Sequence, residues 1–85
     1  MTGKPEDSLI AMRTMRMAKI LGENVRKTRL KRGMTLEALA TEVGLAYSYM
    51  GGIERGQKNP TLDVVERIAS ALDIEPVSLL SRPEE

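Results

Sequence analysis

Residues 46–60, AYSYMGGIERGQKNP, bring hydroxyl, amide and cationic side chains close together in the sequence. Tyrosine and serine hydroxyls donate and accept hydrogen bonds, and arginine and lysine add positive charge to their N–H donors. Side chains of these types bind polar or anionic partners. Catalysis is disfavoured because the chain has no histidine and no cysteine, and so lacks the commonest general base, a thiol nucleophile and the commonest metal ligand. We expect no enzyme activity, no metal and no cofactor.

The charge is distributed unevenly along the chain. The net charge is only +1, yet residues 1–34 hold nine basic and three acidic residues, and residues 35–85 hold four basic and nine acidic residues. The two parts therefore carry +6 and −5. The basic part could form a face that attracts an anionic partner, and the alternative interpretation is an ordinary solvated helix surface.

Composition and apolar spacing predict that short helices position the residues of the polar stretch. A chain of 85 residues with no phenylalanine, no tryptophan and much Ala, Leu, Met, Glu, Lys and Arg is typical of one all-helical domain. Thr35 and Thr61 are suitable N-caps, and glycines 33, 44 and 56 are suitable helix ends. The predicted helices are 18–32, 35–43, 47–54, 62–73 and 76–81.

The N-terminal segment leaves several alternatives open. Ser8 could cap a separate helix that begins at Leu9, or residues 8–17 could join the next helix or remain an arm. Packing roles are expected for Met12, Met15 and Met17. No apolar run approaches the ~20 residues that span a bilayer and no signal-peptide pattern is present, so we expect a cytoplasmic protein without a membrane partner. The predicted boundaries are 1–17 for an N-terminal tail or extra helix, 18–81 for the main domain and 82–85 for a C-terminal tail.

Two of the predicted helices, 35–43 and 47–54, flank a tight turn at residues 44–46. Short helices joined by a glycine-containing turn are typical of a helix-turn-helix, and the small Ala40 facing the turn would let the second helix cross closely over the first. In that motif the first helix lies across the DNA backbone and the second enters the major groove. The alternative is an ordinary helical hairpin in a small bundle, and the spacing alone leaves both open.

The stretch from Leu21 to Leu80 resembles the phage-repressor/Cro-like (XRE-type) family of helix-turn-helix transcriptional regulators. The matching pieces are LGENVRKTRLKRGMT, LEALATEVGL, SYMGGIERGQKNPTLDVVERIASALDI and EPVSLL. Within them, R-x-x-x-G-x-T, L-A-x-x-x-G and IERG-x-x-NPTL occur in the family's order and spacing. Tyrosine followed by glycine in one helix also resembles the restriction–modification controller subgroup. The resemblance implies a five-helix, lambda-repressor-like DNA-binding domain, a homodimer and a palindromic operator.

The resemblance implies base contacts from the start of the second helix of the motif. Tyr47 and Ser48 match positions that point into the groove. On a helix, positions 47 and 51 share a face, as do 48 and 52, so Gly51 and Gly52 are expected on the DNA-facing side, where their missing side chains would permit close approach. Lys58, just after the helix, could also reach a base.

Phosphate contacts are expected from the helix N-terminus at Thr35 and from the residues after the second helix. Free backbone N–H groups at a helix N-terminus favour an anion. Leu36 departs from the family, which often has a glutamine there, so only its backbone could contribute. Residues 8–19 are a third candidate source, through Arg13, Arg16 or Lys19. Tyr49 could reach a phosphate through its hydroxyl or belong mainly to the core. The predicted phosphate contacts are Thr35, Leu36, Tyr49, Arg55, Gln57, Lys58 and Asn59.

Arg29 and Glu54 match a pair that, in the family, ties the recognition helix to the first helix. A bidentate, partly buried pair would fix the tilt of the reading helix, and the alternative is a weak surface pair. Ala46 stands where the family often has a Ser, Thr or Asp cap. The second helix is therefore expected to depend on tertiary packing and on this ion pair.

A dimer interface is expected at the C-terminal end of the chain. The last predicted helix is denser in apolar residues than one thin core requires, and for Val77 and Leu80 closing the core is an equal alternative. The predicted interface residues are Ile74, Val77, Leu79 and Leu80.

The resemblance implies a dimeric DNA-binding transcriptional regulator that binds a palindromic operator near its own promoter. The partners would be double-stranded DNA, a second copy of the chain and RNA polymerase. The alternative is a protein-interaction module on the same fold, such as an antitoxin that binds a toxin-like protein through residues 1–19.

Overall fold

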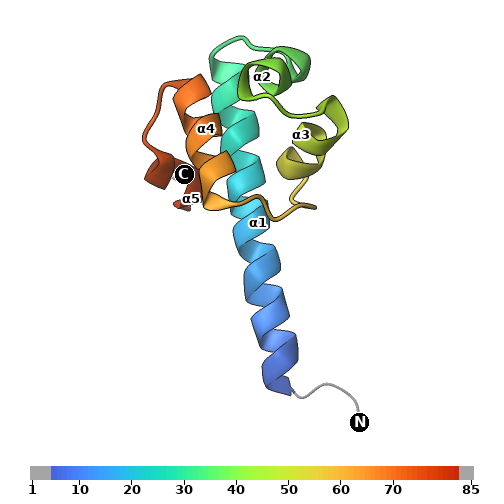
Figure 1. The fold of residues 1–85 in the computed structure, drawn as a ribbon. Coiled ribbons are helices and arrows are strands. Elements are labelled where there is room, and N and C mark those ends of the chain that lie inside the picture. Colours follow the sequence, from blue (N-terminus) through green and yellow to red (C-terminus); the bar gives the residue numbers. More distant parts are fainter. Residues whose placement is uncertain (1–4, 83–85) are drawn as a thin grey trace.

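The computed structural model describes the backbone of residues 5–82 and the side chains of residues 16–82. In this range the fold is all-helical, as predicted, with helices α1 (Pro5–Lys31), α2 (Leu36–Val43), α3 (Tyr47–Glu54), α4 (Leu62–Leu72) and α5 (Pro76–Leu80). Figure 1 shows α2–α5 gathered around the C-terminal half of α1, whereas the N-terminal half of α1 extends away from them. None of the helices in the described range is long and apolar enough to cross a membrane.

The first helix begins earlier than the N-cap prediction placed it. α1 runs without a break from Pro5 to Lys31, so residues 8–17 join the helix that follows and Ser8 lies inside α1 rather than at its start. Proline is favourable in the first turn of a helix because it has no N–H group to leave unsatisfied.

The core forms where the C-terminal half of α1 meets the other helices. α1 contacts α3 and α5, and α4 contacts α2 and α5. Met17 is 43% exposed, which corrects its predicted packing role, and the side chains of Met12 and Met15 lie outside the described residues. The largest fully buried side chains are Val25, Leu39, Met50, Ile53, Ile68, Leu72 and Leu79.

Most helix ends follow the signals in the sequence. Oγ1 of Thr35 accepts a hydrogen bond from the Ala38 N–H at 3.0 Å, and Oγ1 of Thr61 accepts one from the Val64 N–H at 3.2 Å. α4 ends one residue earlier than predicted because Asp73 adopts the left-handed conformation, with φ 58°, which aspartate tolerates better than most residues. The glycines with positive φ are Gly33, Gly44 and Gly56.

Side chains from other helices bind the backbone carbonyl oxygens at the C-terminal ends of three helices. Such carbonyls have no partner within their own helix, and the sequence pattern did not reveal how they are satisfied. Arg67 donates to Val43 at the end of α2 (2.6 Å), Arg32 to Asp73 at the end of α4 (3.3 Å), and Asn24 to Leu79 and Ser81 at the end of α5 (2.9 and 2.7 Å).

Gly22 allows α1 to lie directly against the backbone at the end of α3. It is buried, and a Cβ atom built at position 22 would lie 2.5 Å from the carbonyl oxygen of Glu54 and clash with that of Ile53 as well. A glycine inside a helix costs about 1 kcal/mol relative to alanine. The missing side chain of Gly22 permits a contact between α1 and the backbone of α3 that any larger residue would prevent.

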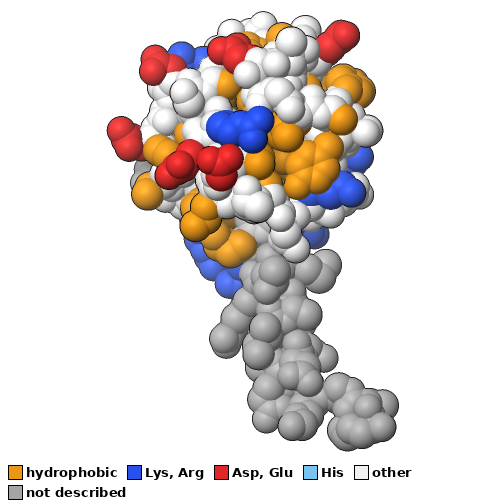
Figure 2. Space-filling view, viewed as in Figure 1, with side chains coloured by type: hydrophobic (Ala, Val, Ile, Leu, Met, Phe, Trp, Pro, Cys, Tyr) orange, Lys and Arg blue, Asp and Glu red, His pale blue; other side chains and the backbone are white. Residues whose placement is uncertain are grey.

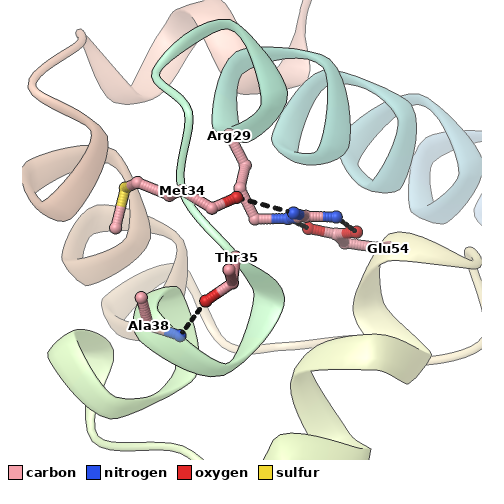
Figure 3. Close-up of polar contacts among 5 residues, drawn as sticks. All are labelled: Arg29, Met34, Thr35, Ala38 and Glu54. Atoms are coloured by element: carbon pink, nitrogen blue, oxygen red, sulfur yellow. Dashed lines mark hydrogen bonds and ion pairs between the residues drawn. The ribbon is translucent and has the colours of Figure 1, made fainter.

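An ion pair between Arg29 and Glu54 makes a second connection between the same helices (Figure 3). Nε of Arg29 donates to Oε2 of Glu54 at 2.6 Å and Nη2 donates to Oε1 at 3.0 Å. Nη1 donates to the carbonyl oxygen of Met34 at 2.8 Å. The two side chains are only 10% and 5% exposed, and the hydrogen bond to Glu54 raises the pKa of Arg29 above its usual value. The ion pair is therefore buried, and the Arg29 guanidinium stays charged.

Replacing Gly22 with alanine should destabilise the fold. The gain in helix propensity of about 1 kcal/mol is outweighed by the clash with two carbonyl oxygens, and overpacking of this kind costs about 1–3 kcal/mol. Urea unfolding followed by circular dichroism measures the difference. Lys27→Ala, an exposed change on the same helix, is the control and should change stability little. A Gly22→Ala protein as stable as the wild type would show that α3 can shift without cost.

Glu54→Gln should lower the free energy of unfolding by about 3 kcal/mol, because it leaves the buried guanidinium of Arg29 without its counter-charge. The exposed pair of Arg67 and Asp63, 3.7 Å apart with side chains 46% and 76% exposed, supplies the control. Asp63→Asn should cost less than about 1 kcal/mol. Equal losses from the two substitutions, measured by urea unfolding, would contradict a special role for the buried pair.

Candidate nucleic-acid interface

α2, the turn at residues 44–46 and α3 form a helix-turn-helix. Gly44 adopts φ 84°, and the backbone N–H groups of Gly44 and Leu45 both donate to the carbonyl oxygen of Ala40 at 2.9 Å. Ala40 itself is only 2% exposed. The two hydrogen bonds to its carbonyl oxygen close the tight turn from which α3 leaves α2.

α3 divides into a core side and an exposed end. Met50 and Ile53 are fully buried, as predicted, and they hold the helix in the core. Tyr47, which is 60% exposed, and Ser48 lie at the N-terminal end with their side chains accessible. Tyr49 is half-buried and packs against the core. Both hydroxyl-bearing residues predicted to read bases are thus available to a partner.

We expected Gly51 and Gly52 on the DNA-facing side, where their missing side chains would permit close approach, but both residues are buried. A Cβ atom built at Gly51 would lie 3.1 Å from Nη1 of Arg55 and 3.4 Å from Cδ2 of Leu36. At Gly52 it would lie 2.9 Å from Cε of Lys58. Arg55 and Leu36 therefore fill the space beside Gly51, and Lys58 fills the space beside Gly52. A partner that approaches α3 at the two glycines would meet these covering side chains rather than the glycine backbone.

Exposed polar and cationic side chains follow α3. Nε of Arg55 donates to Oε1 of Gln57 at 3.2 Å, and Gln57, Lys58 and Asn59 are exposed. The loop also touches α1, because a Cβ atom built at Gly56 would lie 2.9 Å from Cγ of Lys19.

One cation of α1, Lys19, lies beside this loop. Lys19 and Arg16 are exposed, so two of the three basic residues predicted as a further phosphate source are accessible. The side chain of Arg13 lies outside the described residues. The contact at Gly56 places Lys19, but not the others, beside the loop.

The side chain of the first residue of α2 lies close to Arg55. Leu36, the first residue of α2, packs partly into the core and also lies beside Gly51, where it neighbours the Arg55 guanidinium. Thr35 is exposed and caps this helix. The positive end of the α2 dipole favours an anion, and Arg55 supplies a separate cation beside Gly51.

Figure 2 shows one face of the molecule, with side chains coloured by type. Acidic side chains lie over the upper and left parts of this face. At the right-hand edge, at the level where Figure 1 places α3, basic side chains lie beside apolar ones. Basic side chains also lie near the centre and at the lower left of this face (Figure 2).

The predicted dimer residues at the C-terminal end differ in exposure. Leu79 is fully buried, so it closes the core of its own chain and its predicted place in an interface is wrong. Ile74 and Leu80 are half-buried and pack against the core. Val77 is 72% exposed and is the predicted residue with surface to offer. Leu62, at the start of α4, is 73% exposed and was not anticipated.

The sequence did not predict the roles of Gly22, which lies against the end of α3, and of Asn24, which binds the end of α5. A glycine inside an otherwise helical pattern is a usable sign of close helix packing, so Gly22 could have been found. An asparagine on a helix ordinarily faces solvent. Nothing in the sequence distinguishes Asn24, which is 8% exposed and binds the end of α5.

Comparisons with known proteins agree with this geometry. A family model described as helix-turn-helix matches residues 25–79. Control protein C.BamHI of Bacillus amyloliquefaciens is 44% identical over 62 residues, which cover 72% of this chain and 76% of that protein.

Two solved structures are similar in fold and sequence. The restriction–modification controller protein C.AhdI from Aeromonas hydrophila is 44% identical, with a TM-score of 0.70 over 73% of this chain and 94% of that one. The biofilm regulator SinR, solved in complex with DNA, is 32% identical, with a TM-score of 0.68 over 72% of this chain and 98% of that one. The chain therefore belongs to the XRE-type helix-turn-helix family of transcriptional regulators.

Proposed function

We propose that this regulator binds a palindromic DNA operator as a homodimer and reads it with the N-terminal end of α3. The observation that carries the proposal is the division of α3. Met50 and Ile53 fix one side in the core, while Tyr47 and Ser48 stay exposed at the end next to the turn. A helix held in this way can enter the major groove with its first residues against base edges.

Phosphate contacts would position that helix. The N–H groups at the start of α2 would bind one phosphate, and the Arg55 guanidinium would bind another. The exposed Gln57 and Asn59 would bind the backbone after α3, with Lys19 beside their loop. Tyr49 would contribute its hydroxyl from a ring that packs on the core. Contacts of this kind fix register without reading sequence.

The dimer would form around Val77 at the end of the chain. A symmetric dimer places its two recognition helices about 34 Å apart, one turn of DNA, and therefore matches a palindrome. The similarity to C.BamHI and C.AhdI supports a controller-like role in which the protein regulates its own promoter.

A protein-interaction role is a second candidate. α1 continues beyond the residues that pack on the core, as Figure 1 shows, so residues 1–19 could bind a toxin-like protein. In that role the protein would bind DNA weakly and without sequence preference, and selection of bound DNA sites separates the two candidates.

Selection of bound sites from random duplexes should yield a palindrome, and affinity for it should fall steeply as salt rises, because each phosphate contact releases counterions. Tyr47→Ala should reduce the ratio of operator to random-duplex affinity by about tenfold. Arg55→Ala should lower the affinity for the operator and for random duplexes by the same factor, and should reduce the salt dependence of binding. The control for the loss of one positive charge is Lys31→Ala. Lys31 is exposed and lies at the C-terminal end of α1, far along the helix from Lys19. A wild-type ratio near one would overturn the proposed function.

Val77→Asp should convert the dimer to monomer, because it places a charge at the centre of the proposed apolar contact. Analytical ultracentrifugation would show the change in mass, and operator affinity would fall because each subunit then binds one half-site alone. Leu62→Asp is a matched control with the same exposure on α4. Loss of the dimer in the Leu62 variant but not in the Val77 variant would show that the interface lies elsewhere.

A further inference from the structure

Lys58 lies across the surface of α3 at Gly52, although it belongs to the loop that follows the helix. A Cβ atom built at Gly52 would lie 2.9 Å from Cε of Lys58, 3.0 Å from Cγ and 3.5 Å from Cδ. The alkyl chain of the lysine thus occupies the space that any other residue at position 52 would fill. Gly52 is buried for this reason, while Lys58 itself is exposed.

Tyr49 lies at the other end of the lysine side chain. Nζ of Lys58 is 5.8 Å from the centroid of the Tyr49 ring, which is within the range of a cation–π contact. The ring is half-buried and packs against the core, so its position is fixed. The lysine side chain therefore runs from Gly52 to the ring of Tyr49.

The neighbouring glycine has a different cover. At Gly51 the closest atoms belong to Arg55 and Leu36, and none of the three closest belongs to Lys58. The two glycines thus make room for two different cations. This difference provides a matched pair of positions, because an alanine at each should displace one cation and leave the other in place.

We propose that Lys58 serves as the base-reading side chain of α3 at position 52, with Gly52 and Tyr49 as the positioning residues. Its ammonium would donate to the O6 and N7 acceptors of a guanine in the major groove, the atoms that lysine and arginine recognise there. A side chain already held against the helix loses less conformational entropy on binding than a free one. This inference rests on the proposed DNA-binding function.

The test begins with the free protein, in which NMR should show contacts between the Lys58 methylene protons and the Gly52 α-protons. The operator and random-duplex affinities are then measured for the wild type and for four variants: Lys58→Ala, Lys58→Met, Gly52→Ala and the Gly52→Ala/Lys58→Ala double variant. Lys58→Met keeps an unbranched apolar side chain over Gly52 but removes the donor. It tests the reading role without disturbing the glycine.

Each variant should reduce the ratio of operator to random affinity by about tenfold, the size of one lost base contact. The double variant should lose no more than the single ones, because Gly52 acts through Lys58. Gly51→Ala, the matched control, should leave the ratio unchanged, since any loss through Arg55 would affect both duplexes alike.

Three results would overturn the role of Lys58. The first is an equal loss of affinity for both duplexes in Lys58→Ala and Lys58→Met, which is the signature of a phosphate contact. The second is a wild-type ratio of operator to random affinity in a folded Gly52→Ala protein. The third is the absence of NMR contacts between Lys58 and Gly52. A wild-type protein that does not discriminate between the duplexes would overturn the proposed function itself, and the base-reading role with it.

Discussion

The buried ion pair between Arg29 and Glu54 is the interaction on which the rest of the reading surface depends. α3 has eight residues, no side-chain N-cap and two adjacent glycines, so it would not be stable as an isolated helix. The guanidinium binds both oxygens of Glu54 and also the backbone of Met34. One side chain of α1 therefore holds the end of α3 and the loop before α2 at the same time. The close backbone approach at Gly22 fixes the same end from a second point.

Polar contacts between the helices fix relative helix positions that a small hydrophobic core cannot fix alone. A domain of this size buries a modest share of its surface, and its short helices leave many terminal carbonyls without partners. Here Asn24, Arg32 and Arg67 reach from one helix to the end of another. Each contact satisfies backbone groups and also sets the position of one helix relative to another. No buried side-chain nitrogen or oxygen lacks a partner within the described residues.

The sequence predicted the fold well because its signals are local. Apolar spacing, threonine caps and positive-φ glycines indicated the helices from α2 to α5, and the motif residues indicated where α3 lies. The parts it did not predict depend on contacts between distant residues. Helical periodicity placed Gly51 and Gly52 on the partner-facing side, yet periodicity cannot show that Arg55 and Lys58 fold back over them. The apolar density near the C-terminus suggested an interface, but only the packing shows that Leu79 faces inward while Val77 does not.

The spacing of the two α1 residues that hold α3 has a consequence for how such chains can diverge. Gly22 and Arg29 are seven positions apart, almost two turns, and so lie on one side of the helix. Inserting or deleting one residue between them would rotate one by about 100° relative to the other, and α3 could keep only one of its two attachments. Exposed positions in this interval, such as Glu23 and Lys27, can change in type. The length of the interval cannot change, and descendants of this protein should retain it even after most of its exposed side chains have been replaced.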